Sequence, residues 1–477
     1  MLVRQSKNSF IRSTERYGYV TNQLTQFDRV YNSTGADFLR EISREAKDVD
    51  EIVDHLLTIY EGVSREEIKQ DFVDFIQDLA KHRFVYIGET LEDIEKQDLD
   101  FSYADNNPKT LTSVYHQETD QKVGMSTQDY FLEEVQGVPQ ISSIQFELTS
   151  KCNERCIHCY IPNSKKDHGF DMPTAKVKSI LDEFAELGGL HVTLSGGEVF
   201  MYKDLLEIVR YCREKNLKIS ILSNLISLKD SQIPVLRECN LSLVQVSLYS
   251  TIPEVHDAIT TIKGSCEKTM ANIGKLIAAD IPVQISCPIM KTNKDSYIGV
   301  VDYAAKHNIK AQTDYIMMAR ADLSTDNLDQ RLTMDDTEKL LRNIIEHDIE
   351  YRKGTLKQIP KSEQMLLDFE AFKKQPLCGV GYDNCCITAN GDVYPCAGWQ
   401  GLILGNIYKS SLKDIWENST QIKELRKVTE ESFPKCLECE AYDFCNRCLV
   451  RNYNESNGDM FNIPQAFCDE AFLLKRL

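Results

Sequence analysis

Several common features are missing from this sequence. No cysteine occurs before Cys152, although the 477-residue chain has 16 cysteines. No uninterrupted apolar run is long enough to span a bilayer, and residues 1–7 contain no apolar core of a signal peptide. We therefore expect a cytoplasmic protein with no membrane partner, in which cysteines bind metals or clusters rather than form disulfides.

Positive charge is also scarce. The chain has 55 lysines and arginines against 73 acidic residues, a net charge of -18. Such an acidic chain is a poor match for nucleic acid, so we expect no nucleic-acid partner; a cationic or neutral partner, such as a peptide, fits better. The composition, 42% hydrophobic and 27% charged, is that of a globular protein, and the length predicts about two to four domains.

Three cysteines lie close together in the sequence. Cys152, Cys156 and Cys159 follow an apolar run at residues 144–148. Thiolates on such a short loop can hold three irons of a cubane cluster and leave the fourth iron open. An open iron can bind and reduce a small molecule. The alternatives are a zinc site that lacks one ligand, although zinc sites usually use Cys-x2-Cys pairs, or three unrelated buried thiols.

After this loop, apolar strand-like segments alternate with helix-like segments. This alternation predicts a parallel sheet, and the strand before the loop brings the predicted number of strands to six. We therefore predict an α/β fold with a partial (β/α)6 barrel over residues 141–330, with its chemistry at the C-terminal ends of the strands. The predicted later strands cover residues 191–194, 218–222, 243–247, 282–286 and 311–315.

Polar residues follow several of these predicted strands. Two glycines after the second strand let a ligand approach the backbone closely, and the carboxylate beside them can accept from an ammonium group. The other candidates end the third and fourth strands, where hydroxyls can also cap the next element. The candidates are Gly196, Gly197, Glu198, Ser223, Asn224 and Ser247. Asp314 and Arg320 flank the end of the last strand and are further candidates for contacting a ligand.

The pattern Cys-x3-Cys-x2-Cys after a first strand, with Gly-Gly-Glu after the second, resembles the radical S-adenosylmethionine (SAM) superfamily. The resemblance implies that Cys152, Cys156 and Cys159 hold a 4Fe–4S cluster whose open iron binds SAM. It also implies that the Gly-Gly-Glu motif holds the SAM amino group. Reductive cleavage would then give a 5′-deoxyadenosyl radical, which abstracts hydrogen. Val199 stands where the family usually has proline.

Residues 1–95 predict a small winged-helix-like α+β domain. Strand-like segments cover residues 10–14, 17–21, 25–31 and 84–87, with three helices before the last strand. This order, carried by residues 30–34, 50–53 and 71–75, resembles the leader-peptide recognition domain of ribosomal-peptide maturases. The resemblance implies that a leader peptide adds as a strand to the sheet edge. The alternative, a DNA-binding winged helix, would need a basic recognition helix.

Residues 89–140 are polar, and we interpret the acidic run at residues 89–100 as solvated. We assign residues 96–140 to a linker, partly helical around residues 129–134, and residues 331–376 to a helical bridge with helices at 334–352 and 362–374.

Residues 377–477 contain nine of the cysteines. Asn390-Gly391 between strand-like residues predicts a hairpin. The order Cys-x12-Gly-x4-Cys, then Cys-x2-Cys-x5-Cys-x2-Cys and a final cysteine, resembles the SPASM domain, which holds two auxiliary 4Fe–4S clusters. Relatives commonly have x3 before the last cysteine of the second group. A zinc ribbon is the alternative.

The SPASM resemblance implies a ligand set for each auxiliary cluster. The outer cluster would be held by Cys436, Cys439, Cys445 and Cys468. The inner cluster would be held by Cys378, Cys396 and Cys448, with Cys385 or Cys386 as a fourth ligand. Adjacent strand residues point to opposite faces, so one of this pair reaches the cluster more easily; we favour Cys386. Without either, the inner cluster keeps an open iron.

Together these resemblances cover nearly the whole chain and imply a radical SAM maturase of ribosomally synthesised peptides. We expect SAM and three 4Fe–4S clusters as cofactors. The expected partners are a precursor peptide with a leader and a cysteine-containing core, and a reductant such as flavodoxin or ferredoxin. The expected product is a thioether from cysteine sulfur to carbon. The alternatives are carbon–carbon cross-linking, anaerobic sulfatase maturation, and a zinc-stabilised peptide-binding scaffold.

Overall fold

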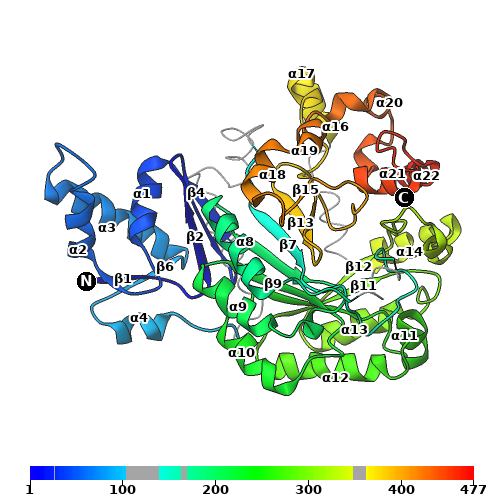
Figure 1. Cartoon of the computed structure of the whole chain (residues 1–477), viewed down its shortest axis with the longest axis horizontal. Coiled ribbons are helices and arrows are strands. Elements are labelled where there is room, and N and C mark those ends of the chain that lie inside the picture. The colour runs from blue at the N-terminus through cyan, green and yellow to red at the C-terminus, as the bar shows by residue number, and fades with distance from the viewer. Residues whose placement is uncertain (26, 104–138, 163–168, 348–360) are drawn as a thin grey trace.

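The chain folds into three parts that follow one another along the sequence (Figure 1). The computed structural model describes residues 1–25, 27–103, 139–162, 169–347 and 361–477. The N-terminal part lies at one end, a parallel sheet with its helices lies in the middle, and the C-terminal part packs on one side of that sheet. The helical part predicted around residues 129–134 lies outside the described residues.

The N-terminal part contains two three-stranded antiparallel sheets, ordered β5-β1-β6 and β2-β3-β4. Its strands are β1 (Leu2–Gln5), β2 (Ser9–Ser13), β3 (Gly18–Asn22), β4 (Phe27–Tyr31), β5 (Lys47–Asp48) and β6 (Val85–Gly88). Its helices are α1 (Ser33–Glu41), α2 (Val49–Leu56), α3 (Arg65–Lys81) and α4 (Leu91–Gln97). The predicted α+β order is confirmed, whereas β1 was not predicted.

The acidic run at residues 89–100 is mostly exposed, as predicted, but it also forms helix α4 and buries Ile94 and Asp98. Thr90 caps helix α4. Its hydroxyl accepts a hydrogen bond from the backbone N–H of Asp93, and the Asp93 carboxylate accepts one from the backbone N–H of Thr90. Acidic residues in the first turn favour this helix end electrostatically, and Ile94 is fully buried. Asp98 then accepts from Ser6 at 2.9 Å and from Arg4 at 3.2 Å. The segment therefore packs on the N-terminal domain.

The middle part confirms the predicted partial (β/α)6 barrel. Its six strands are parallel and ordered β12-β11-β10-β9-β8-β7. They are β7 (Ser143–Glu147), β8 (His191–Ser195), β9 (Lys218–Ser223), β10 (Leu243–Ser247), β11 (Val283–Pro288) and β12 (Lys310–Asp314). The helices are α8 (Thr174–Glu186), α9 (Leu205–Glu214), α10 (Ile233–Glu238), α11 (Pro253–Thr260), α12 (Ser265–Ala278) and α13 (Tyr297–Lys306).

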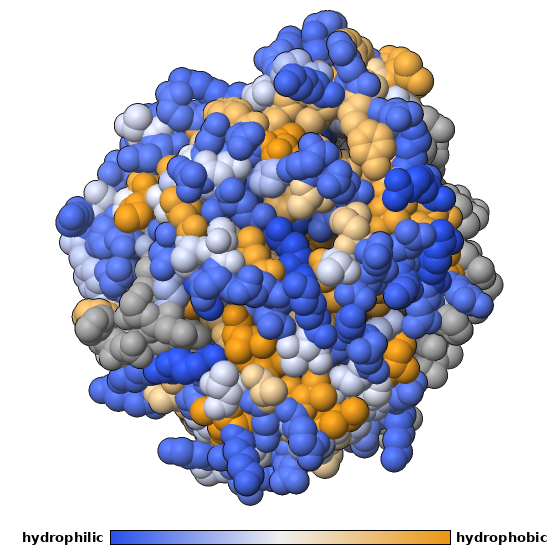
Figure 2. Space-filling model, turned by 90° about the vertical axis from the view of Figure 1, so that its right-hand side faces the viewer, coloured by the Kyte–Doolittle hydropathy of each residue, from blue (hydrophilic) through white to orange (hydrophobic). Residues whose placement is uncertain are grey.

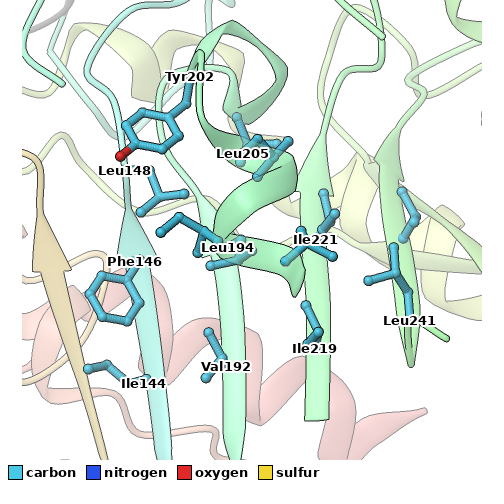
Figure 3. Close-up of a cluster of buried hydrophobic side chains, with 14 of the residues drawn as sticks. Ile144, Phe146, Leu148, Val192, Leu194, Tyr202, Leu205, Ile219, Ile221 and Leu241 are labelled. Carbon is cyan, nitrogen blue, oxygen red and sulfur yellow. The ribbon is translucent and has the colours of Figure 1, made fainter. Parts of the chain in front are cut away.

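The core of this barrel lies between the strands and the helices that cover them (Figure 3). Successive strand residues point to opposite faces. Ile144 and Phe146 therefore point into this core from β7, as Val192 and Leu194 do from β8. Burying each such side chain stabilises the folded protein by about 1.5–3 kcal/mol relative to leaving it exposed to water. The residues between them, such as Gln145, lie on the other face, which we call the inner face.

The C-terminal part extends the barrel sheet instead of forming a separate one. Strand β13 (Asn384–Thr388) pairs in parallel with β7, and β14 (Asp392–Tyr394) and β15 (Gly405–Asn406) follow, so the sheet has nine strands. The predicted hairpin at Asn390-Gly391 is confirmed by the antiparallel pairing of β13 with β14. Gly391 has a φ of 88°, which favours glycine.

Helices make up most of the rest of the C-terminal part. They are α14 (Met334–His347), α16 (Lys361–Leu367), α17 (Phe369–Lys373), α18 (Leu412–Asn418), α19 (Thr420–Leu425), α20 (Pro434–Leu437), α21 (Leu449–Glu455) and α22 (Gln465–Arg476). The predicted helix at residues 334–352 is confirmed as far as residue 347, and its last residues lie outside the described ones. No helix in the described ranges has both the length and the hydropathy needed to cross a bilayer. Figure 2 shows a face on which hydrophilic residues dominate and apolar residues form small separate groups.

Candidate functional site

The loop with the three cysteines, residues 152–159, follows β7 and is held by the middle part of the chain. Two of its backbone N–H groups, those of Arg155 and Ile157, donate to carbonyl oxygens of α11 at 3.1 and 3.0 Å. Cys156 is buried, and Cys152 and Cys159 are partly exposed. The sequence reasoning did not predict α11, although Pro253 at its first turn is a typical helix-start signal.

Arg320 also holds this loop. Its side chain is 8% exposed, donates to the carbonyl oxygen of Cys159 at 2.6 Å, and pairs with Asp326 at 2.8 Å. Arg320 was a candidate for contacting a ligand, and in this structure it contacts the backbone of the cysteine loop. Asp314 accepts from the backbone N–H of Ile316 at 2.8 Å.

All nine residues predicted to form the SAM-binding site line one cavity of about 300 Å³, which we call the cluster cavity. They are Cys152, Cys156, Cys159, Gly196, Gly197, Glu198, Ser223, Asn224 and Ser247. The cavity lies at the C-terminal ends of the strands, because the loops after β7 and β8 and the ends of β9 and β10 supply these residues. Tyr249 and Met317 also line it and were not predicted, although Tyr249 lies two residues after the end of β10.

The two glycines allow the loop after β8 to pack on the chain that leads to the cysteines. A Cβ atom on Gly197 would lie 2.3 Å from the carbonyl oxygen of Lys151, and one on Gly196 would lie 2.6 Å from that of Thr149. The backbone N–H of Gly197 donates to Thr149 at 2.7 Å. The glycines therefore permit contact between two backbone segments, in addition to any contact with a ligand.

Glu198 connects the ends of β8 and β9. Its carboxylate accepts from the Ser223 hydroxyl at 2.7 Å, from the Asn224 backbone N–H at 2.8 Å and from the Phe200 N–H at 3.0 Å. Burial raises the pKa of Glu198, and these three hydrogen bonds oppose the rise. Ser223 and Asn224 thus position Glu198, while all three residues line the cluster cavity.

The C-terminal cysteines gather in two groups. Burial raises the pKa of Cys378, and the nearby thiols of Cys448 and Cys396 raise it further. The four cysteines predicted for the outer cluster also interact with one another. Burial raises the pKa of Cys445 to about 11, Arg447 opposes this rise, and the other three thiols add to it; these are Cys436, Cys468 and Cys439.

The two adjacent cysteines of β13 lie on opposite faces of the sheet. Cys385 lies opposite Ile144 in the register with β7 and packs in the barrel core. Cys386 lies opposite Gln145 on the inner face. Burial raises the pKa of Cys386, and Glu147, Cys385 and Cys396 add to this. Cys386 therefore lies on the inner face, near Glu147 and the Cys396 thiol.

The thiol chemistry of these cysteine sets, rather than their placement in this structure, suits iron–sulfur clusters. Thiols are the usual ligands of 4Fe–4S clusters, and each cysteine binds a different iron. Within the described ranges, no group of three or more His, Cys, Asp or Glu side chains is placed to hold a metal ion. The polar residues of the cluster cavity are suited to a ligand with amino and carboxylate groups.

Strand β4 forms one edge of its sheet. It pairs with β3, and among the described residues no strand pairs with its other side. Helix α3 lies beside it: the rings of Tyr31 and Phe75 meet edge to face at 5.0 Å, and the Tyr31 hydroxyl donates to Asp78 at 3.3 Å. An edge strand next to a helix is the type of surface to which an extended peptide can add.

A partial parallel barrel with three cysteines after its first strand, followed by two further cysteine groups, defines the class of a radical SAM protein with auxiliary clusters. Family models agree: the radical SAM superfamily matches residues 146–304, the SPASM iron–sulfur cluster-binding domain residues 378–448, and coenzyme PQQ synthesis protein D (PqqD) residues 29–85. The chain therefore contains these three domains, as predicted. Their cofactors are SAM and more than one 4Fe–4S cluster.

The chain is similar to curated proteins with different named activities. It is 29% identical to the AdoMet-dependent heme synthase of Methanosarcina barkeri over 65% of this chain and 91% of the relative. It is 26% identical to the antilisterial bacteriocin subtilosin biosynthesis protein AlbA of Bacillus subtilis over 67% of this chain and 69% of the relative. It is 26% identical to the mycofactocin maturase MftC of Mycobacterium tuberculosis over 63% of this chain and 76% of the relative.

Solved structures share the fold. Streptococcus suis SuiB bound to precursor peptide SuiA aligns with a TM-score of 0.64 and 16% identity over 98% of this chain and 99% of that chain. Native anSMEcpe with bound AdoMet and Kp18Cys peptide aligns with a TM-score of 0.52 and 17% identity over 71% of this chain and 99% of that chain. The likeness to SuiB extends over all three parts of this chain.

Proposed function

We propose that this protein is a radical SAM maturase that introduces thioether cross-links, from cysteine sulfur to carbon, into a ribosomally synthesised precursor peptide. The observation that carries this proposal is the presence of a PqqD-like domain with an open strand edge in the same chain as the cluster cavity. SuiB, whose fold this chain shares, was solved with a precursor peptide, and AlbA is named for the biosynthesis of a bacteriocin.

We assign Cys152, Cys156 and Cys159 to the cluster that binds SAM. The residues assigned to the contacts with SAM are Gly196, Gly197, Glu198, Ser223, Asn224 and Ser247. Bound SAM supplies the carbon radical that removes hydrogen from the peptide. The loop geometry supports this assignment, because α11 and Arg320 hold the cysteines at the cavity wall. Glu198, positioned by Ser223 and Asn224, can accept a hydrogen bond from an ammonium group on its cavity side.

We assign the auxiliary clusters as the sequence predicted, with Cys386 completing the inner set. The thiol interactions and the inner-face position of Cys386 support these ligand sets. We also propose that the leader binds along β4 and α3, by strand addition. The domain limits at residues 95, 140, 330 and 376, the flavodoxin or ferredoxin reductant and the cytoplasmic location stay predictions.

The decisive experiment uses the anaerobically reconstituted full-length protein. Three clusters of four predict about twelve irons per chain, whereas a zinc-stabilised scaffold would contain zinc and little iron. SAM and a reductant should then yield 5′-deoxyadenosine. Short open reading frames beside the gene supply candidate precursor peptides. A thioether product loses a pair of hydrogen atoms per cross-link and has a cysteine that no longer reacts with an alkylating reagent.

The same experiment separates the alternatives. A modified peptide whose cysteines all remain alkylatable would indicate carbon–carbon cross-linking and contradict the thioether proposal. Modification of a leaderless peptide at an unchanged rate would argue against leader recognition and favour a sulfatase-maturase-like enzyme. Reaction of a tetrapyrrole, with no change in any peptide, would contradict the maturase proposal.

A further inference from the structure

A second cavity, of about 340 Å³, adjoins the cluster cavity on the inner face of the sheet; we call it the acid cavity. The two cavities share Ile161 and Gly197 as lining residues. The acid cavity lies at the C-terminal ends of the paired strands β7 and β13 and beside the turn that joins β13 to β14. A group bound there would therefore lie beside the SAM-binding site.

The walls of the acid cavity are mostly apolar. Ile161, Ala389 and the rings of Phe170 and Tyr394 contribute to them. Phe170 is 57% exposed, although large apolar side chains are usually buried in monomeric proteins. An exposed aromatic ring at the wall of a cavity can contact the carbon chain or the cation of an incoming side chain.

One wall contains a buried carboxylate. Glu147 is the charged residue among the described residues that line this cavity, and it is 6% exposed. The side-chain amide of Gln400 donates to both its oxygens at 3.1 Å, and the Tyr160 hydroxyl donates at 3.0 Å. Two side chains thus supply three hydrogen bonds to the carboxylate, and both can donate to an ionised carboxylate, which only accepts. Gln400 comes from the SPASM domain, so two domains form this end of the cavity.

The lining therefore combines an apolar wall with an anionic end. Lysine and arginine side chains have the matching structure, because they bury an apolar stem and carry a charged donor at the tip. A cation that meets a buried carboxylate forms a charge-assisted hydrogen bond, which is stronger than a neutral one. The acidity of the whole chain, with a net charge of -18, also favours a cationic partner.

We propose that the acid cavity binds a lysine or arginine side chain of the substrate peptide and thereby selects the residue that lies next to the SAM-binding site. This inference rests on the proposed function for the identity of the ligand as a peptide. Glu147 acts as a specificity-determining residue, and Phe170 contacts the stem of the bound side chain.

The test compares two probes that have the same carbon stem and differ in the ammonium group. They are Nα-acetyl-lysine methylamide and Nα-acetyl-norleucine methylamide, titrated into the oxidised full-length holoenzyme by ligand-observed NMR. We expect the lysine probe to bind at least about tenfold more tightly, the effect of one charge-assisted hydrogen bond. Equal affinity of the two probes would overturn the proposal.

Variants test whether Glu147 causes the tighter binding of the lysine probe. The Glu147→Gln variant should abolish this preference, whereas Glu186→Gln, which removes an exposed charge on α8, should leave it unchanged. A lysine preference that survives in Glu147→Gln would overturn the proposal. The Phe170→Ala variant should lower the binding affinity of both probes by similar factors. If Glu147→Gln fails to fold, Ala389→Leu, which fills the cavity, should abolish binding of both probes, and retained binding would overturn the proposal.

Release of 5′-deoxyadenosine, measured in the same preparations without peptide, separates this inference from the proposed function. A holoenzyme that prefers the lysine probe but releases no deoxyadenosine would contradict the proposed function and retain the binding site. A holoenzyme that cleaves SAM but shows no preference would contradict the binding site alone.

Discussion

The two regions that contain the cysteine groups differ in how their residues come together. The cysteine loop places its three thiols within residues 152–159, and contacts from α11 and Arg320 hold its backbone. The C-terminal thiols come from residues 378–468, and several chain segments must pack before they meet. The first group is local in sequence, and the second is assembled by tertiary structure.

This difference has an energetic consequence. Around the C-terminal thiols, buried ion pairs connect segments that are distant in sequence, such as Arg447 with Glu430 and Arg331 with Glu455. The cysteine loop is instead fixed by two backbone hydrogen bonds to α11 and by side-chain hydrogen bonds, such as those that Arg320 and Asn327 donate to its carbonyl oxygens. We therefore expect substitutions in the loop to affect SAM cleavage, and substitutions near the C-terminal thiols to affect stability and iron content.

The largest expected effect is that of Cys156→Ala. Removing one thiol from the loop should lower the rate of deoxyadenosine release by more than about 100-fold. Even a substitution of a residue that only supports a metal ligand typically lowers activity by 10–100-fold. The variant should keep about eight irons, from two remaining clusters of four. Iron content and deoxyadenosine are measured on the same sample. Full iron content with unchanged cleavage would show that this loop is not the SAM-binding site.

Arg447→Met tests the C-terminal region. The side chains of Arg447 and Glu430 are 4% and 6% exposed, so the variant leaves a buried carboxylate without its cation. The free energy of unfolding should fall by about 3–5 kcal/mol, measured by denaturant titration. The matched control is Arg342→Met, which breaks an exposed pair on α14 and should cost about 0.3–0.5 kcal/mol. Similar losses in the two variants would contradict a stabilising role of burial here.

The adjacent pair on β13 offers a sharper comparison. Cys386→Ala should lose about four irons, because it removes a ligand of the inner cluster. Cys385→Ala should keep its iron and lose roughly 1–2 kcal/mol of stability, since it leaves a small cavity in the barrel core. Iron analysis and thermal unfolding distinguish the two variants. If both retain full iron, the fourth site of the inner cluster is open or has another ligand.

The smallest expected effect is that of Arg320→Gln. The variant loses the bond to the Cys159 carbonyl and the pair with Asp326. It should retain its iron, while deoxyadenosine release slows by about tenfold, the lower end of the effect of losing a partner behind a metal ligand. Arg320→Lys should recover part of the rate. A loss of iron as large as that of Cys156→Ala would show that Arg320 is needed for cluster assembly instead.

Much of the fold could be predicted because its signals are local. The six parallel strands follow from apolar runs separated by amphipathic helices, and the β13–β14 hairpin follows from Asn390-Gly391. Helix α4 was missed because its sequence is acidic, and its burial rests on Ile94 alone among its residues. Helix α11 is short, and no strand directly follows it, so the alternation of strands and helices did not reveal it.

The candidate site, like the fold, could be predicted where its sequence signals are local. The cysteine loop, the Gly-Gly-Glu turn and the strand-end hydroxyls follow strands, so the parallel sheet was enough to predict that they share one cavity. The role of Gly197 could not be predicted, because its close contact with Lys151 depends on how two loops pack. Arg320 was noticed for its position after β12, but its contact with Cys159 required the fold.

The sequence by itself determined the class of protein, because spacings of cysteines and glycines are local features that specific chemistry requires. Only the tertiary structure decided that β13 adds to the barrel beside β7, since strand pairing between residues so far apart leaves no local pattern. That pairing brings Cys386 to the inner face and Gln400 to the buried carboxylate of Glu147. The acid cavity therefore exists because two domains share one sheet, which no single segment of the chain encodes.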